Sequence, residues 1–139
     1  NMNVPKNNIM HHTKWITHHC HSFLGKGKIW TPNFAVANYY VDSSDFLGAH
    51  SDPVESIGPF ACVASVTLGA ARKFKLKPVN AKVFEDGSVL TSISFRLPHN
   101  SILVMWEGFQ EFWRHEVPID KGLTEHPFSG DLFDVFYVF

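Results

Sequence analysis

Alternating apolar and polar positions dominate the chain after residue 33. The clearest case is 72–77, where basic and apolar side chains alternate with the period of a half-buried strand. Other apolar or alternating runs, separated by proline and glycine turn signals, predict further strands at 34–41, 61–68, 88–97, 102–106, 113–117 and 132–139. Many short strands with little helix between them predict a mainly β sandwich or jelly roll.

Residues 1–33 follow a helical pattern instead. Apolar positions recur at three- and four-residue steps between Ile9 and Leu24, which predicts a short amphipathic helix that ends near Gly25. The segment is rich in histidine, but the histidines around Cys20 lack a second ligand pair at zinc spacing. We therefore interpret them as solvated helix positions rather than as a second metal site.

The amino-acid composition and the net charge are those of a small globular protein. With 139 residues, 45% hydrophobic and 18% charged, the chain predicts one globular domain, with 1–33 as a helical or lid segment and 34–139 as a β core. A net charge of −1 excludes the global basic field of many nucleic-acid binders. Two cysteines and no apolar run long enough to span a bilayer favour an intracellular protein without a membrane anchor. Because the first residue is Asn1 rather than Met, we expect a fragment of a longer chain.

A candidate metal site begins at His50 and Asp52. Two residues apart in an extended segment, their side chains project to the same side. With His115 from a distant strand they would form two histidines and one carboxylate, the ligand set of non-haem Fe(II) with open positions. The alternative is that His50 is an ordinary loop residue and His115 a hydrogen-bonded histidine beside Trp113.

Several collinear motifs between Trp30 and Gly130 add a family resemblance. The chain resembles the AlkB family of Fe(II)- and 2-oxoglutarate-dependent dioxygenases, in its eukaryotic, fungal-like DNA-repair branch. The motifs that carry the resemblance are Trp30-Thr31-Pro32-Asn33-Phe34, Ala37-Asn38-Tyr39-Tyr40, Gly48-Ala49-His50-Ser51-Asp52, Ile57-Gly58-Pro59, 64–74, 98–103, Gln110-Glu111 before Arg114-His115, and 126–130.

This resemblance implies a double-stranded β-helix (a cupin-like jelly roll) and a set of site residues. The iron ligands fall on His50, Asp52 and His115, and the side chains that hold 2-oxoglutarate fall on Asn38 and Tyr40. Arg72 matches a basic position near the nucleic acid, and we add Lys73 and Trp30 as candidate substrate contacts. Together with other lysines, Arg72 and Lys73 would form a phosphate-facing patch, or else a merely solvated strand face.

The implied activity is oxidative demethylation of alkylated bases in DNA, with Fe(II), 2-oxoglutarate and O2. RNA is an alternative substrate, and we expect a monomer located in the nucleus. A dioxygenase of proteins or small molecules, and a catalytically impaired metal- or nucleic-acid-binding relative, are the competing hypotheses.

The last strand departs from the family. The family pattern Arg-x-Asn-x-Thr-x-Arg falls here on Phe133, Val135, Tyr137 and Phe139, so both cosubstrate arginines are absent. Tyr137 could donate one hydrogen bond to 2-oxoglutarate, but it does not replace a charge. Three explanations stay open: a truncated or misread end, a substitute cation (Arg72, Arg96 or Lys75) that reaches the pocket, or lost turnover.

Overall fold

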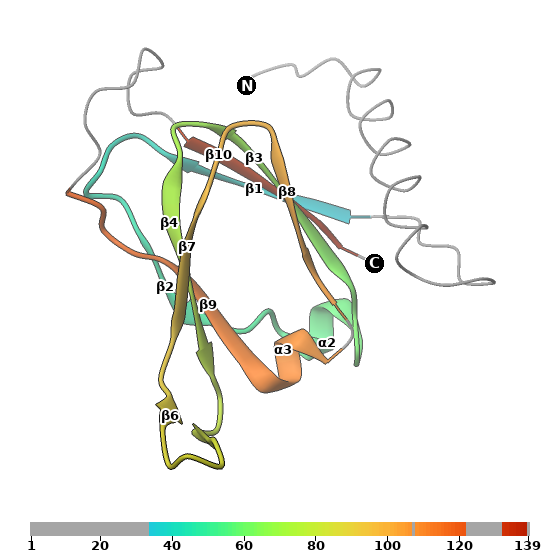
Figure 1. The fold of residues 1–139 in the computed structure, drawn as a ribbon. Coiled ribbons are helices and arrows are strands. Elements are labelled where there is room, and N and C mark those ends of the chain that lie inside the picture. Colours follow the sequence, from blue (N-terminus) through green and yellow to red (C-terminus); the bar gives the residue numbers. More distant parts are fainter. Residues whose placement is uncertain (1–33, 107, 122–131, 139) are drawn as a thin grey trace.

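Two antiparallel four-stranded sheets face each other in this computed structural model, which describes residues 34–106, 108–121 and 132–138 (Figure 1). The first sheet, sheet A, has the strand order β1-β10-β3-β8, and the second, sheet B, has the order β2-β9-β4-β7. The elements are β1 (Phe34–Tyr40), β2 (Leu47–His50), α2 (Val54–Ile57), β3 (Val63–Gly69), β4 (Arg72–Pro78), β5 (Lys82–Val83), β6 (Val89–Leu90), β7 (Ile93–Leu97), β8 (Ser101–Met105), α3 (Phe109–Phe112), β9 (Trp113–Val117) and β10 (Leu132–Val138).

The chain changes sheet at nearly every connection. β3 lies in sheet A and β4 in sheet B, β7 returns the chain to β8 of sheet A, and β9 and β10 again belong to different sheets. At the corner between β3 and β4, Gly69 has a φ of 103°, a backbone conformation that side chains other than glycine rarely adopt. This winding between two sheets is a jelly roll, so the predicted mainly β fold is confirmed.

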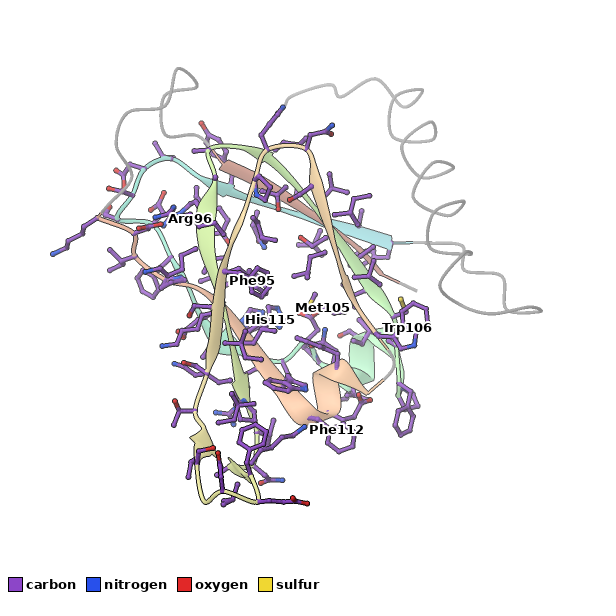
Figure 2. All side chains as sticks on the ribbon, viewed as in Figure 1. Phe95, Arg96, Met105, Trp106, Phe112 and His115 are labelled. Carbon is purple, nitrogen blue, oxygen red and sulfur yellow. The ribbon has the colours of Figure 1, made fainter. Side chains whose placement is uncertain are left out.

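The core lies between the sheets. One buried cluster combines Tyr40 of β1 with Phe74, Leu97 and Val117 of sheet B, and Leu103 of β8 packs against it. Figure 2 shows Phe95, Met105 and His115 in the space between the sheets, with Arg96 and Phe112 toward the outside. Burial of these large apolar side chains from both sheets is the main force that holds the two layers together.

The structure differs from the sequence predictions in two places. The predicted strand 88–97 is two strands, β6 and β7, and β6 pairs with the preceding β5 in a small hairpin. The helices α2 and α3 were not predicted, because a four-residue helix is too short to show a helical period. The predicted helix and lid at 1–33, with Trp30, lie outside the described residues. Within the described residues, no helix is long and apolar enough to cross a bilayer.

A buried arginine links two loops to sheet B. Arg72, the first residue of β4, is 1% exposed, and its guanidinium donates hydrogen bonds to the backbone carbonyls of Asp42 (2.8 Å), Asp45 (2.6 Å) and Pro118 (3.2 Å). Its guanidinium also lies 5.3 Å from the centre of the Tyr40 ring. Arg72 therefore joins the loop after β1 and the loop after β9 to the sheet.

We predict that Arg72→Met lowers the free energy of unfolding by about 3 kcal/mol or more, because three carbonyl acceptors lose their charged donor. Urea unfolding followed by tryptophan fluorescence measures this change. The matched control is Lys73→Met, an exposed neighbour on the same strand, which should change stability by no more than about 0.5 kcal/mol. Equal stability of the two variants would contradict the assigned role of Arg72.

Candidate metal centre

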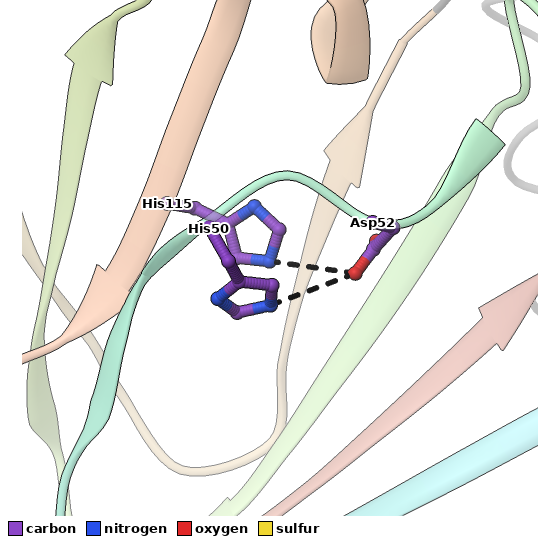
Figure 3. Close-up of side chains that lie close together, drawn as sticks. All are labelled: His50, Asp52 and His115. Carbon is purple, nitrogen blue, oxygen red and sulfur yellow. Dashed lines mark ion pairs between the residues drawn. The ribbon is translucent and has the colours of Figure 1, made fainter.

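The structure brings His50, Asp52 and His115 together around one point (Figure 3). His50 is the last residue of β2, and His115 lies opposite it in the register of β9. The Nε2 atoms of His50 and His115 lie 3.6 and 3.8 Å from the same Oδ1 of Asp52, and the candidate ligand atoms all lie within 4.8 Å of one another. Residues 65 positions apart along the chain thus become neighbours through one strand pairing.

The orientation of His50 is set by its own strand. Its Nδ1 lies 2.8 Å from the carbonyl oxygen of Gly48. A carbonyl can only accept a hydrogen bond, so the proton of the neutral ring belongs on Nδ1, which leaves the Nε2 lone pair facing Asp52. This is the arrangement by which metal-binding histidines hold their tautomer and ring orientation.

His115 is enclosed by rings. Its side chain is 1% exposed, and the Phe74 ring stacks against it with centroids 5.8 Å apart and planes 17° from parallel. The ring of Phe109 lies at 6.3 Å, and the ring of His50 at 4.3 Å. The imidazole of His115 is therefore held in a mainly apolar environment, with His50 and Asp52 as its polar neighbours at the site.

This environment shifts the pKa values of the two histidines in opposite directions. The pKa of His115 is lowered to about 4, with burial as the largest cause; the neighbouring His50 also lowers it, and Asp52 opposes both. The interaction with Asp52 raises the pKa of His50, burial opposes that rise, and the Gly48 carbonyl assists it. His115 is consequently neutral at pH 7, as a metal ligand must be.

The donor set fits a divalent first-row metal. Two ligand atoms at right angles, with metal bonds of about 2.1 Å, lie roughly 3 Å apart. The separations of 3.6 and 3.8 Å between the histidine Nε2 atoms and Asp52 exceed this by less than 1 Å. Two imidazoles and one carboxylate are the facial ligand set that non-haem Fe(II) uses.

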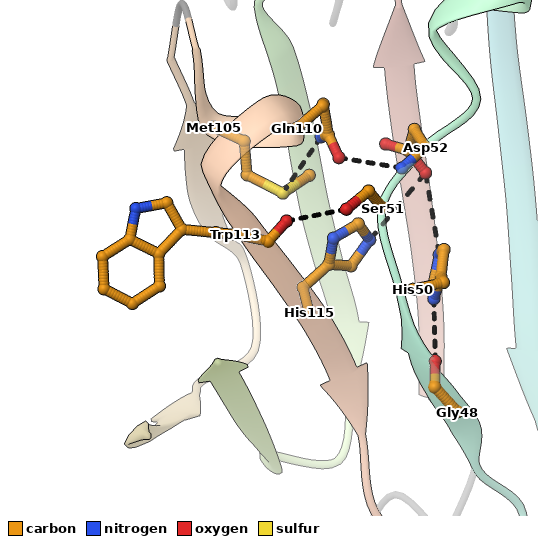
Figure 4. A network of polar contacts seen from close by, with 8 residues as sticks. All are labelled: Gly48, His50, Ser51, Asp52, Met105, Gln110, Trp113 and His115. Atoms are coloured by element: carbon orange, nitrogen blue, oxygen red, sulfur yellow. Dashed lines mark hydrogen bonds and ion pairs between the residues drawn. The ribbon is translucent and has the colours of Figure 1, made fainter. Parts of the chain in front are cut away.

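Asp52 is attached to the segment that carries His115 (Figure 4). Its backbone N–H donates to Oε1 of Gln110 at 2.9 Å, and the Ser51 hydroxyl donates to the carbonyl of Trp113 at 2.8 Å. We did not single out Gln110 or Ser51 from the sequence as site residues. No spacing pattern could have found them, because these contacts join residues 58 and 62 positions apart.

A cavity of about 290 Å³ opens beside the three candidate ligands, which border it. This volume is at the lower end of the range for ligand pockets, which begins at about 300 Å³. The other residues around the cavity are mostly apolar and come from β1, β2, the N-cap of α2 and the end of α2: Phe34, Val36, Asn38, Leu47, Pro53, Ser56 and Ile57.

Of the residues predicted to hold 2-oxoglutarate, the structure brings Asn38 to the cavity wall. Tyr40 lies two residues further along β1 and is buried in the apolar core beside Arg72. The side chain of Tyr137 lies outside the described residues. Its register partners are Ala35 and Ala64, whereas the cavity residue Asn38 pairs with Asp134.

In this structure the guanidinium of Arg72 is buried and binds three backbone carbonyls, which gives it a structural role, and its contact with nucleic acid stays a prediction. Lys73 is exposed on the outer side of sheet B and does not border the cavity.

The three cations suggested as substitutes, Arg72, Arg96 and Lys75, do not border the cavity. Arg96 pairs with Asp120 at 2.9 Å, and Lys75 lies 3.7 Å from Glu116. Among the described residues, no lysine or arginine borders the cavity.

We predict that His115→Ala abolishes stoichiometric binding of Fe(II), because it removes one of the three candidate ligands found among the described residues. Iron content after anaerobic loading and desalting measures this loss. His99→Ala is the matched control, since Nδ1 of His99 accepts a hydrogen bond from the Gly69 backbone N–H outside the site. Retention of one equivalent of iron by His115→Ala would contradict this ligand set.

Comparisons with known proteins agree with the fold and the site. Mouse DNA oxidative demethylase ALKBH2 is 31% identical over 91 residues, which cover 66% of this chain and 38% of the relative. The human ALKBH2 is 30% identical over 91 residues, covering 66% of this chain and 35% of its own. Mouse alpha-ketoglutarate-dependent dioxygenase alkB homolog 3 is 32% identical over 89 residues, which cover 63% of this chain and 31% of the relative. The chain thus spans about a third of the length of these curated relatives.

A solved structure and a family model extend the comparison. The structure of OsALKBH1 superposes with a TM-score of 0.63 at 19% identity and covers 91% of this chain and 62% of that one, which shows a shared fold. The model of the 2OG-Fe(II) oxygenase superfamily matches residues 3–129. The chain belongs to the 2OG-Fe(II) oxygenase superfamily and is an AlkB-like member of it.

Proposed function

We propose that this protein is an Fe(II)- and 2-oxoglutarate-dependent dioxygenase that removes alkyl groups from nucleobases by oxidation. The observation that carries the proposal is the convergence of His50, Asp52 and His115 beside one cavity, in a member of the 2OG-Fe(II) oxygenase superfamily. Bound Fe(II), with 2-oxoglutarate and O2, supplies the oxidising chemistry, and the protein supplies binding, orientation and exclusion of water.

The residues of the site have distinct parts in this proposal. His50 and His115 offer neutral nitrogen ligands and Asp52 an anionic oxygen, which leaves one face of the metal open to cosubstrate and O2. The rings of Phe74 and Phe109 hold the His115 imidazole and keep water from it. The apolar wall of the cavity can accept the flat face of a base turned out of its stack.

A basic surface supports nucleic acid as the substrate. The outer side of sheet B carries five cations that come from β4, β7 and β9, namely Lys73, Lys75, Lys77, Arg96 and Arg114. Two acids accompany them: Glu116 lies near Lys75 and Lys77 (3.7 and 3.0 Å), and Asp120 near Arg96. The excess of positive charge favours a phosphate backbone.

We further propose alkylated DNA as the natural substrate, with RNA as the alternative, and a role in DNA repair. The support is the name of the relatives, DNA oxidative demethylase, together with the basic side of sheet B. A DNA substrate would place the protein in the nucleus. A monomer is sufficient for this activity, since the three candidate ligands come from one chain.

Binding of 2-oxoglutarate should be weak, because no cation among the described residues borders the cavity. Loss of one partner of a buried ion pair costs roughly 3–5 kcal/mol, which corresponds to about two to four decades in affinity. We therefore expect a dissociation constant near millimolar or above. Calorimetric titration of the Mn(II)-loaded protein measures it, and a micromolar constant would show that a cationic partner exists elsewhere in the chain.

Succinate formation tests the proposed function directly. The protein is incubated with Fe(II) and millimolar 2-oxoglutarate, with a methylated or an unmethylated oligonucleotide of the same sequence. We expect succinate and formaldehyde only with the methylated strand, and none from His115→Ala. Succinate at the same rate with either oligonucleotide would point to another substrate class, such as a protein or a small molecule.

A second candidate function is a metal- and nucleic-acid-binding protein without turnover. The observation that favours it is the same lack of a cation at the cavity within the described residues. Oligonucleotide and metal binding without succinate formation, and without binding of 2-oxoglutarate at millimolar concentration, would establish this alternative.

A further inference from the structure

Asp52 is the candidate ligand that no strand holds. His50 and His115 are register partners in the ladder of β2 and β9, so backbone hydrogen bonds restrict the positions of both. Asp52 lies between the end of β2 and the start of α2, and the ladder does not reach it. Its place relative to the two imidazoles must therefore come from contacts with other parts of the fold.

Gln110 makes such a contact. Its Oε1 accepts the backbone N–H of Asp52 at 2.9 Å, and its Nε2 donates to Sδ of Met105 at 3.7 Å. The side chain of Gln110 is 3% exposed and Met105 is fully buried, so the amide is enclosed on both sides (Figure 4). The two contacts use both ends of the amide and orient its oxygen toward Asp52.

This contact is one of two hydrogen bonds that join the segment before α2 to the segment before β9. Ser51 donates its hydroxyl hydrogen to the Trp113 carbonyl, so two consecutive residues before α2 bind the short segment from Gln110 to Trp113. That segment leads directly into β9, where His115 lies two residues beyond Trp113. The position of Asp52 is thus tied to the strand that carries the second histidine.

We infer that Gln110 is a positioning residue for the metal: it fixes Asp52 against His50 and His115 and thereby raises metal affinity. The inference rests on the metal site of the proposed function. Groups that orient metal ligands in this way typically change affinity 10–100-fold when removed.

Co(II) titration followed by visible absorption tests the inference without any turnover. Gln110→Met keeps the length of the side chain but removes the acceptor, and should weaken cobalt binding about 10–100-fold and alter the cobalt spectrum. Gln110→Glu keeps an acceptor oxygen in the same place and should retain most of the affinity. Gln110→Asn withdraws the acceptor by one carbon and should lose affinity while remaining polar, which covers the case in which the methionine variant does not fold.

Glu111→Met is the matched control on the same helix. Oε1 of Glu111 accepts the backbone N–H of Phe60 at 2.7 Å, in a loop that bears no candidate ligand. This variant should lower the unfolding temperature and leave cobalt affinity and spectrum unchanged. Wild-type cobalt affinity in Gln110→Met or Gln110→Asn, or an equal loss in Glu111→Met, would overturn the role of Gln110. Failure of the unsubstituted protein to bind cobalt would instead overturn the metal site itself.

Discussion

The pairing of β2 with β9 is the constraint on which the site depends. It sets His50 opposite His115 with ring centroids 4.3 Å apart, in a place where His115 is almost completely buried. Two imidazoles this close cannot both be cationic at modest cost, and burial holds the pKa of His115 low. With the Asp52 carboxylate beside them, one divalent cation would bind all three groups and supply the positive charge that the site otherwise lacks.

The rest of the fold serves this pairing by holding both strands of the pair. Phe74 of β4 stacks on His115, and the apolar cluster around Phe74 and Val117 joins sheet B to sheet A. Arg72 binds the loops that follow β1 and β9, so it restrains β9 just beyond His115. A residue that the family resemblance associated with nucleic acid is therefore part of the architecture, because its cation is satisfied by carbonyl oxygens in the interior.

The register of β10 against β1 bears on the positions that the family pattern assigns to the cosubstrate. The cavity residues Val36 and Asn38 of β1 pair with Phe136 and Asp134, whereas Tyr137 pairs with Ala35. Because side chains alternate between the faces of a sheet, a shift of one residue moves a whole set of positions to the other face. Within β10, the family pattern falls on Phe133, Val135 and Tyr137. The residues opposite Asn38 and Val36 are Asp134 and Phe136, so the pattern is offset by one residue from the positions that pair with the cavity residues.

Much of this protein was determined by sequence alone. Alternating runs located most strands within one or two residues, because the period of two is a local property of a half-buried strand. His50 and Asp52 could be expected to share a side for the same local reason. The sequence also indicated His115 as the third ligand, but only the tertiary structure showed that strand pairing sets it opposite His50 and that Gln110 contacts the Asp52 backbone. Away from the site, only the tertiary structure showed that Arg72 is buried rather than on the surface. These depend on long-range register and packing, which the order of residues along the chain does not display.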